Sequence, residues 1–376
     1  MTTMLLRNLP TRFTYSGLTV VLAFAVLWHF YNFMTGAGYH VAWTKDNSPN
    51  KAARSLSEES IPNLAHFVYI LKDSGSDLIF RFSDFLSVYA AYYYWRPKVI
   101  YLHTDAPEET INRARDGLSG KWSRLIFRIP GLRAVPALVP SHASNGAEIS
   151  LIEHKSDFVR VQAIRKFGGT YIDFDAHPLR DIKVLRESGF NAISGRQFGG
   201  QVMSGTFMSK KSSKMISLWA EEMHKVYDGG WTTHSNEVIT RVSEHLVAEP
   251  GEMLIMEREA FGPGSWNSED CVHLFEVHND TTSNLEGIVP SDGLPSFNDG
   301  SADTWNHSEM PPPWADDWSR TYILHAFNPK RSGIIVNGFD RITPRYVLER
   351  RSNFARAVYP IAKILYERGL FEINDS

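Results

Sequence analysis

The order of apolar and polar positions along this chain predicts strands and helices that alternate. Short apolar runs rich in β-formers predict buried strands, and longer stretches with apolar residues at helical spacing predict helices. The first elements expected are a strand at 64–71, a helix at 82–95, a strand at 98–103 and a helix at 107–117. A strand, a helix and a strand at this spacing indicate a parallel α/β sheet.

The clearest helix is expected over residues 148–167, where apolar side chains fall at spacings that build one face. Gly168 and Gly169 follow and are expected to end it as a C-terminal cap. The apolar residues 170–174 then predict a strand. The helix therefore leads directly into a strand through a glycine break.

The second half of the chain continues the alternation less regularly. Further strands are predicted at 190–194, 201–208 and 322–325, and helices at 212–227, 235–247 and 343–368. Residues 261–319 are rich in turn-forming residues, so they predict a long loop region with one strand near 272–277. Residues 122–140 are apolar with prolines and are compatible with either type of element.

An uncharged apolar stretch near the N-terminus, residues 17–35, predicts a transmembrane helix. Its core is about 17 residues long, which is near the lower limit for crossing a bilayer. Arg7 and Arg12 precede it and the next cation is Lys45, so the N-terminus is expected in the cytosol. A cleaved signal peptide is the alternative, but the aromatic end of the stretch favours an uncleaved anchor.

The remaining chain is expected to be lumenal. The predicted organisation is a cytoplasmic tail at 1–16, a signal anchor at 17–35, a polar stem at 36–60 and a lumenal domain at 61–376. Two glycosylation sequons begin at Asn279 and Asn306, and both lie in the turn-rich stretch where surface acceptors are expected. They agree with a lumenal body.

Composition excludes some classes of protein. Hydrophobic residues make up 43% and charged residues 22%, as in a globular protein with a substantial core. The chain has 39 basic and 42 acidic residues, so it lacks the basic excess that would indicate nucleic acid as a partner. Cys271 is the single cysteine, so no intramolecular disulfide can form. The aromatic content of 12% predicts a large core, or aromatic faces that stack on sugars or bases.

The candidate chemistry centres on Asp173-Phe174-Asp175, which follows the predicted helix, glycine break and strand. Ligands of open α/β sheets bind at the carboxyl ends of strands. Strand alternation would place Asp173 and Asp175 on one side, where both can face a common ion. Two carboxylates suit Mn²⁺ or Mg²⁺ held jointly with a substrate diphosphate. The alternative is a pair of acids in a solvated turn.

Asp157 and Arg160 lie three residues apart in the preceding helix and therefore share a face. Arg160 could hold a phosphate or orient a sugar hydroxyl, and Asp157 could accept hydrogen bonds from sugar hydroxyls. A surface ion pair is the alternative. The helix runs into the strand that carries the carboxylates, which favours a role near the site.

The segment SDFVR (156–160), followed by FGGTYIDFDAHPLRDI (167–182), resembles the signature of glycosyltransferase family 32. This family includes fungal mannosyltransferases and animal α-1,4-galactosyl- and N-acetylglucosaminyltransferases. The segment 61–66 resembles the opening strand of the same family. The resemblance implies an α/β fold of GT-A type, with a Rossmann-like mixed sheet flanked by helices. It also implies a nucleotide-sugar donor, a divalent metal and retention of anomeric configuration.

The resemblance further implies roles for individual residues. Asp175 would ligate the metal, Asp173 would contact metal or donor ribose, and His325 is the best candidate for a third ligand. His66 would line the nucleotide pocket, or merely pack. The residues predicted to bind substrate are His66, Asp157, Arg160, Gly169, Tyr171, Ser204, Gly205, Asn236 and Glu237. The sequence departs from the family near Ser204-Gly205 and Ser235-Asn236, which bears on the acceptor pocket more than on the chemistry.

Together these features predict a hexosyltransferase that uses GDP-mannose or a UDP-hexose and acts on a glycan or glycolipid hydroxyl. The anchor and the sequons predict a single-pass type II protein of the Golgi or ER membrane, and the resemblance favours the Golgi. Two alternatives stay open at this point. One is a non-catalytic membrane-tethered glycan-binding protein, and the other is a phosphohydrolase with a nucleophilic aspartate. Phosphohydrolases usually carry a hydroxyl residue two positions after the second aspartate, where this chain has His177.

Overall fold

The computed structural model describes residues 60–279 and 312–376. All of them belong to the second of two units into which the chain divides, Arg54–Ser376. The predicted tail, transmembrane helix and stem therefore lie outside the described residues, apart from residue 60. The sequon at 306–308 also lies outside, as does most of the one that begins at Asn279. Within the described ranges, every helix is too short or too polar to span a bilayer.

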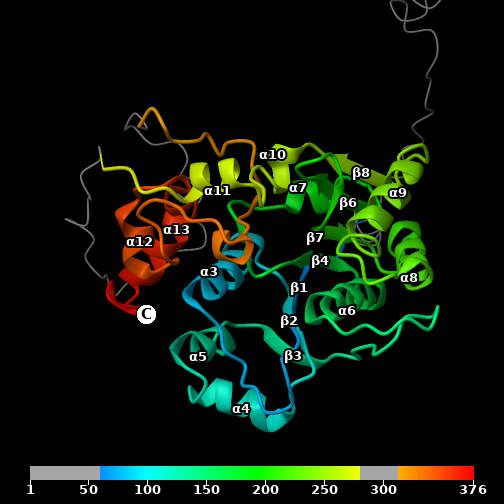
Figure 1. Ribbon diagram of the computed structural model, residues 1–376, viewed down its shortest axis with the longest axis horizontal. Coiled ribbons are helices and arrows are strands. Elements are labelled where there is room, and N and C mark those ends of the chain that lie inside the picture. Colours follow the sequence, from blue (N-terminus) through cyan, green and yellow to red (C-terminus); the bar gives the residue numbers. More distant parts are fainter. Residues whose placement is uncertain (1–59, 280–311) are drawn as a thin grey trace, which may run out of the picture. The chain divides into compact units, whose positions relative to one another are not determined.

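A mixed seven-stranded sheet forms the centre of the described residues (Figure 1). Its strand order is β3-β2-β1-β4-β7-β6-β8. The strands are β1 Leu64–Tyr69, β2 Val99–Thr104, β3 Leu132–Pro136, β4 Gly169–Ile172, β6 Ala192–Arg196, β7 Val202–Ser209 and β8 Met253–Met256. Strands β1 to β4 are parallel, whereas β7 runs antiparallel to both β4 and β6. The predicted α/β class with a mixed sheet is confirmed.

Helices cover both faces of this sheet. They are α3 Phe82–Ala90 with its π-helical continuation Ala91–Trp95, α4 Glu108–Asp116, α5 Lys121–Phe127, α6 Ile152–Phe167, α7 Lys183–Arg186, α8 Lys214–Val226, α9 Asn236–Leu246, α10 Arg258–Phe261, α11 Ser268–Phe275, η3 Pro329–Ser332, α12 Pro344–Glu349 and α13 Asn353–Glu367. Adjacent residues of β1 point to opposite faces, so Phe67 packs in the cluster of α3 and α13, and Val68 packs in that of α6, α8 and α9. Figure 1 shows α3 and α6 on opposite sides of β1.

Most elements match the hydrophobic pattern, and two predictions are wrong. The strand predicted near 272–277 is instead helix α11, which begins where the Asn267 side chain accepts from the Asp270 amide. The helix predicted over 343–368 is two helices, because Arg350 adopts a left-handed conformation that ends α12. Ser352 then caps α13. The ambiguous stretch 122–140 contributes α5 and β3.

A second, two-stranded sheet joins distant parts of the chain. Strands β5 (Ala176–Pro178) and β9 (Ile323–His325) pair antiparallel, with Ala176 opposite His325. Strand β5 was not predicted, and it follows the segment 173–175 directly. The pairing therefore carries the end of β9 to the end of β4.

The glycine break between α6 and β4 is a point of close backbone contact. Helix α6 ends at Gly168, which has a φ of 68°. Gly169 has a φ of 112°, and a Cβ built there would lie 2.7 Å from the Leu64 carbonyl oxygen and 2.9 Å from Leu64 Cβ. Only glycine combines this φ with this approach. The two glycines therefore set where β4 starts against β1, as the sequence predicted for the helix end.

Gly169→Ala is expected to destabilise the domain by about 3 kcal/mol, because it adds a steric clash to the backbone strain. Gly146→Ala is the matched control, since Gly146 has a φ of 88° but nothing lies within 4 Å of its built Cβ. Strain alone should cost the control about 1 kcal/mol. Urea unfolding of both variants measures the difference, and equal losses of stability would contradict the clash.

Two buried histidines cross-link β1, β2 and the start of β4. His66 Nδ1 lies 2.9 Å from His103 Nε2, and His66 Nε2 lies 2.9 Å from the Gly168 carbonyl oxygen. Burial, then the neighbouring His103, lower the pKa of His66 to about 3. Burial, then Lys166, lower the pKa of His103 to about 4. Both imidazole rings are therefore neutral in the folded protein.

We expect acid to destabilise the domain through this pair. Because the pKa values lie below the ordinary 6.5, the stability is present above pH 6.5 and is lost as the pH falls toward 4. Each histidine contributes a slope of up to about 1.4 kcal/mol per pH unit. The free energy of unfolding, measured from pH 7 to pH 5, should fall less steeply in His103→Gln than in wild type.

His142→Gln is the control for this pH series, because His142 is exposed on a loop. Its slope should equal that of the wild-type protein. If all three proteins show one slope, the buried pair does not carry the pH dependence.

Candidate active site

The two carboxylates of the Asp-Phe-Asp motif are brought together by a turn. Strand β4 ends at Ile172, and the Ala176 amide donates to the Asp173 carbonyl oxygen at 3.1 Å. The expectation that strand alternation aligns the carboxylates is therefore wrong, although they do lie together. Phe174 packs against Phe67 and Phe80, with ring centroids 5.1 and 5.3 Å apart, and anchors the turn in the core.

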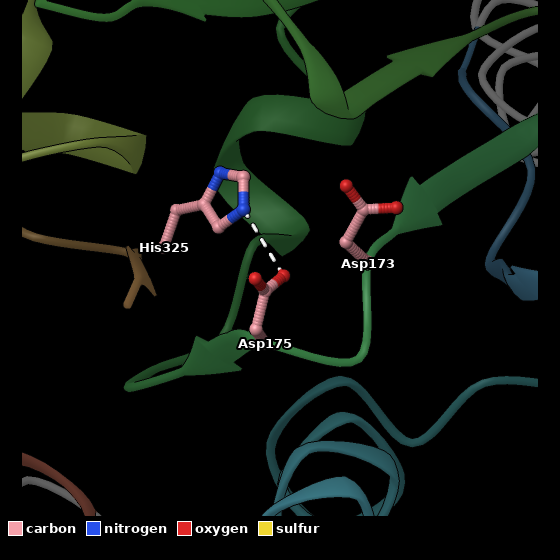
Figure 2. Close-up of side chains that lie close together, drawn as sticks. All are labelled: Asp173, Asp175 and His325. Carbon is pink, nitrogen blue, oxygen red and sulfur yellow. Dashed lines mark hydrogen bonds and ion pairs between the residues drawn. The ribbon is translucent and has the colours of Figure 1, made fainter. Parts of the chain in front are cut away.

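Asp173, Asp175 and His325 form a compact group of donor atoms (Figure 2). One ligand atom from each lies within 4.8 Å of the others. His325 Nε2 lies 3.1 Å from Asp175 Oδ1, and the Ala326 amide donates to the Asp175 carbonyl oxygen at 2.8 Å. The pairing of β5 with β9 thus brings the predicted third ligand to the motif.

This group fits a divalent cation. Two carboxylates and one imidazole are donors that Mn²⁺ accepts readily, and the carboxylates also suit Mg²⁺. The side chains of Asp173 and Asp175 are 25% and 38% exposed, so a cation there would keep positions open for a substrate. Only His325 is buried, at 7%.

Strand β7 has no side chain at Gly205, and this leaves space for the donor atoms. The Asp173 amide donates to the Gly205 carbonyl oxygen at 2.9 Å. A Cβ built on Gly205 would lie 2.5 Å from Asp173 Oδ2 and 2.8 Å from His325 Cε1. Gly205 therefore belongs to the site through its missing side chain.

Charge is distributed unevenly within the group. Burial raises the pKa of Asp173, and this effect outweighs the attraction of Arg160. Burial also acts to raise the pKa of Asp175, but the charge and hydrogen bond of His325 hold it below its ordinary value. Burial acts to lower the pKa of His325, and the charge of Asp175 overcomes this and raises it. Asp175 and His325 therefore stabilise each other's charged forms.

Arg160 lies next to the motif and contacts Asp173 and three neighbouring residues. Its Nη2 lies 3.0 Å from Asp157 Oδ1 and 3.3 Å from Asp173 Oδ1, and its Nη1 donates to the Ser204 carbonyl oxygen at 3.1 Å. The guanidinium lies 4.6 Å from the centroid of the Tyr171 ring. The side chains of Asp157 and Arg160 are about 11% and 8% exposed, so the alternative of a surface ion pair is wrong.

Two further groups fix the carboxylates from the protein side. The Tyr171 hydroxyl donates to Asp173 Oδ1, and His234 Nε2 lies 2.8 Å from Asp157 Oδ2. The His234 ring stacks on Phe158 at 5.4 Å and is fully buried. His234 was not predicted, because a single histidine in an aperiodic loop carries no signal in the sequence.

The predicted residues of β7 and α9 lie beside this network to different degrees. Ser204 Oγ donates to Asn236 Oδ1 at 3.0 Å, and Asn236 Nδ2 donates to the Val202 carbonyl oxygen at 3.2 Å. Ser204 reaches the cluster through its carbonyl group. Glu237 is exposed and accepts from the Thr232 hydroxyl at 2.6 Å, so the structure does not bring it to the carboxylates.

Two other predicted residues lie away from the carboxylates. His66 is fully buried, with both ring nitrogens engaged by His103 and Gly168, which favours the packing alternative. Gly169 contributes the close contact with β1 described above. Their predicted contact with substrate stays a prediction.

Two charged groups near Asp175 had no signal in the sequence. Burial raises the pKa of Asp84 to about 6, and the nearby charge of Asp175 adds to the rise. Arg331, in the turn after β9, helps to lower the pKa of Asp175. An acidic side chain on α3 and a basic side chain on η3 therefore flank the motif.

Part of the chain matches a known protein family. Residues 101–193 match the family described as a glycosyltransferase sugar-binding region containing a DXD motif. The chain is also 24% identical over 232 residues to glucan organizing enzyme 1 of Cryptococcus neoformans var. grubii, and the match covers 58% of each protein. The predicted resemblance is confirmed: the chain carries a region similar to the glycosyltransferase sugar-binding region with the DXD motif. The chain spans just over half the length of that relative.

Solved structures were compared as well. The PaToxG glycosyltransferase is 12% identical with a TM-score of 0.36, and the match covers 54% of this chain and 77% of that chain. The glycosyltransferase GlyE of Streptococcus pneumoniae TIGR4 is 12% identical with a TM-score of 0.35, and the match covers 80% and 60%. TM-scores this low carry no argument about the site.

Gly205→Ala is expected to weaken Mn²⁺ binding at least tenfold, because the added methyl group displaces Asp173 and His325. Calorimetric titration of Mn²⁺ into the full chain measures the affinity. Gly75→Ala is the control, since a Cβ built there meets nothing closer than 3.5 Å. Equal Mn²⁺ affinity in both variants would argue that these side chains do not bind the cation.

Proposed function

We propose that this chain is a metal-dependent hexosyltransferase of GT-A type. It would move a hexose from GDP-mannose or a UDP-hexose to a hydroxyl of a glycan or glycolipid, with retention of configuration. The observation that carries the proposal is the convergence of Asp173, Asp175 and His325 at the end of β4, next to the buried Asp157–Arg160 pair. Donor, acceptor and stereochemistry rest on the resemblance to family 32.

The position of the site in the sheet supports a GT-A type fold. Four adjacent strands, β3-β2-β1-β4, are parallel, and the motif follows the last of them at its carboxyl end. Ligands of such sheets bind at this edge. Strand β7 then runs antiparallel along β4 and supplies Gly205 to the same place.

The proposed cofactor is Mn²⁺ or Mg²⁺, held by Asp173, Asp175 and His325. When bound, it would neutralise the charge that develops on the departing nucleoside diphosphate. The protein side chains orient these donors in advance. Tyr171 and Arg160 both contact Asp173 Oδ1, so this carboxylate is directed before any ligand arrives.

Arg160 is more suited to orient carboxylates than to hold a phosphate. The contacts of its two terminal nitrogens to Asp157, Asp173 and Ser204 lie within the protein. Asp157 is fixed by Arg160 on one oxygen and by His234 on the other, and each oxygen keeps a free acceptor site. We propose that Asp157 accepts hydrogen bonds from the donor sugar and that Arg160 positions it.

The predicted location is part of the proposal. The apolar residues 17–35, with Arg7 and Arg12 before them, support a type II anchor in the Golgi or ER membrane. The catalytic domain would then be lumenal. Protease protection of the full chain in sealed microsomes tests this, because a cytosolic domain would be digested without detergent.

Asp175→Asn is expected to lower the release of UDP or GDP from the preferred sugar nucleotide by about a hundredfold or more, because a cation ligand is lost. A panel of UDP- and GDP-sugars is assayed with Mn²⁺ and again with a chelator, which should stop the wild-type reaction. Asp116→Asn, at the exposed end of α4, is the control. Metal-dependent release that survives in Asp175→Asn would remove this residue from the chemistry.

A further inference from the structure

A row of aromatic side chains leads from the candidate metal site to the surface. The His325 ring stacks on Phe327 at 4.1 Å, Phe327 meets Trp266 edge to face at 5.5 Å, and Trp266 meets Phe198 at 6.1 Å. We call Phe198, Trp266 and Phe327 the aromatic ridge. They come from the β6–β7 loop, the turn before α11 and the end of β9, so the fold assembles the ridge from three segments.

Two of the three ridge residues are exposed although their rings are large and apolar. Trp266 is 43% exposed and Phe198 is 42% exposed. Single exposed apolar residues are common, but a contiguous apolar group beside a site marks a binding surface. Core packing therefore does not account for the ridge.

The turn that carries Trp266 is tightly packed, although the Trp266 side chain is exposed. The adjacent Ser265 is buried and accepts from the Asn267 amide at 3.2 Å, and Asn267 caps α11. Upstream, a Cβ on Gly262 would lie 2.3 Å from Met203 Cε, and Met203 Sδ lies 3.4 Å from His325 Nδ1. The turn is thus packed against the site at one end and against a helix at the other. A ring carried by such a turn binds a ligand with little loss of conformational entropy.

The charge around the ridge favours a neutral ligand. Arg258 lies 5.3 Å from the Phe198 centroid, but its Nη2 lies 2.5 Å from Asp270 Oδ2 and its Nε donates to the Gly262 carbonyl oxygen. This cation is therefore neutralised within the protein. A nucleoside diphosphate carries negative charge and gains little here, whereas a sugar chain needs no counter-charge.

We propose that the aromatic ridge binds the acceptor and that the acceptor is a neutral oligosaccharide. This inference rests on the proposed transferase function. Sugar rings present apolar C–H faces that pack on aromatic rings, while their hydroxyls stay in water. Because the ridge starts at His325, the end of a bound chain reaches the donor site. The three adjacent rings offer stacking positions for more than one sugar, so the proposed acceptor is an oligosaccharide rather than a single sugar.

The test measures transfer by the full chain in detergent to oligosaccharides of glucose, mannose and galactose, from two to six sugars long. Trp266→Ala should raise the KM for the acceptor about tenfold, which equals about 1.4 kcal/mol. Trp266→Phe should restore most of the affinity, because it keeps a ring. Leu118→Ala is the control, since Leu118 is a large apolar residue that is 68% exposed in the turn after α4, away from the site.

Several outcomes would overturn the proposal. One is an acceptor KM that is equal in Trp266→Ala and Leu118→Ala. Another is a higher donor KM in hydrolysis by Trp266→Ala with an unchanged acceptor KM, which would assign the ridge to the donor base. A third is a higher acceptor KM in Trp266→Ala that is seen with glycolipid acceptors and is absent with free oligosaccharides. Melting temperatures of the variants establish that each is folded.

The same variants on an oligosaccharide array separate this inference from the proposed function. Binding that depends on Trp266, without metal-dependent donor hydrolysis by the wild-type protein, would retain the ridge as a glycan site and reject the transferase. Donor hydrolysis without Trp266-dependent binding would retain the transferase and reject the ridge as a glycan site.

Discussion

The arrangement of the site depends on holding two carboxylates close together in a partly buried place. Asp173 and Asp175 repel each other, and burial penalises the charge of both. The fold compensates from two sides, with Arg160 beside Asp173 and His325 beside Asp175. Helix α6 and the β5–β9 pairing matter for function because they deliver these two partners. A divalent cation held by both carboxylates and by the neutral imidazole would take over this compensation, because it would displace the proton that His325 shares with Asp175.

The parts of the site that are local in the chain could be predicted from the sequence. Asp157 and Arg160 share a helix face, and the glycine break placed Asp173 and Asp175 at the edge of the sheet. Their detailed geometry could not be predicted, because a turn and an extended strand both bring residues i and i+2 together. His325 was found through the family resemblance, since nothing local distinguishes it from other strand-end histidines.

The missed features are those that depend on tertiary contacts. His234 lies in a loop and gains its meaning from Asp157, which is distant in the sequence. Helix α11 was taken for a strand because its few apolar residues fit either period, and the cap from Asn267 decides the outcome. The aromatic ridge joins three segments, so composition could only indicate that aromatic faces were abundant. The local sequence pattern thus predicts helices and strands well, but it predicts poorly which of their residues come into contact.

The direction in which the site opens follows from the exposure of its three donors. The carboxylates of Asp173 and Asp175 face solvent in part, whereas His325 is covered by Phe327 and Met203. A substrate that completes the coordination of a cation must therefore arrive on the carboxylate side. On the far side of His325 the described surface is aromatic, and Arg258, the cation beside Phe198, is neutralised by Asp270. Charged and aromatic surfaces thus meet at one imidazole, which suits the proposed reaction between a charged donor and a neutral acceptor.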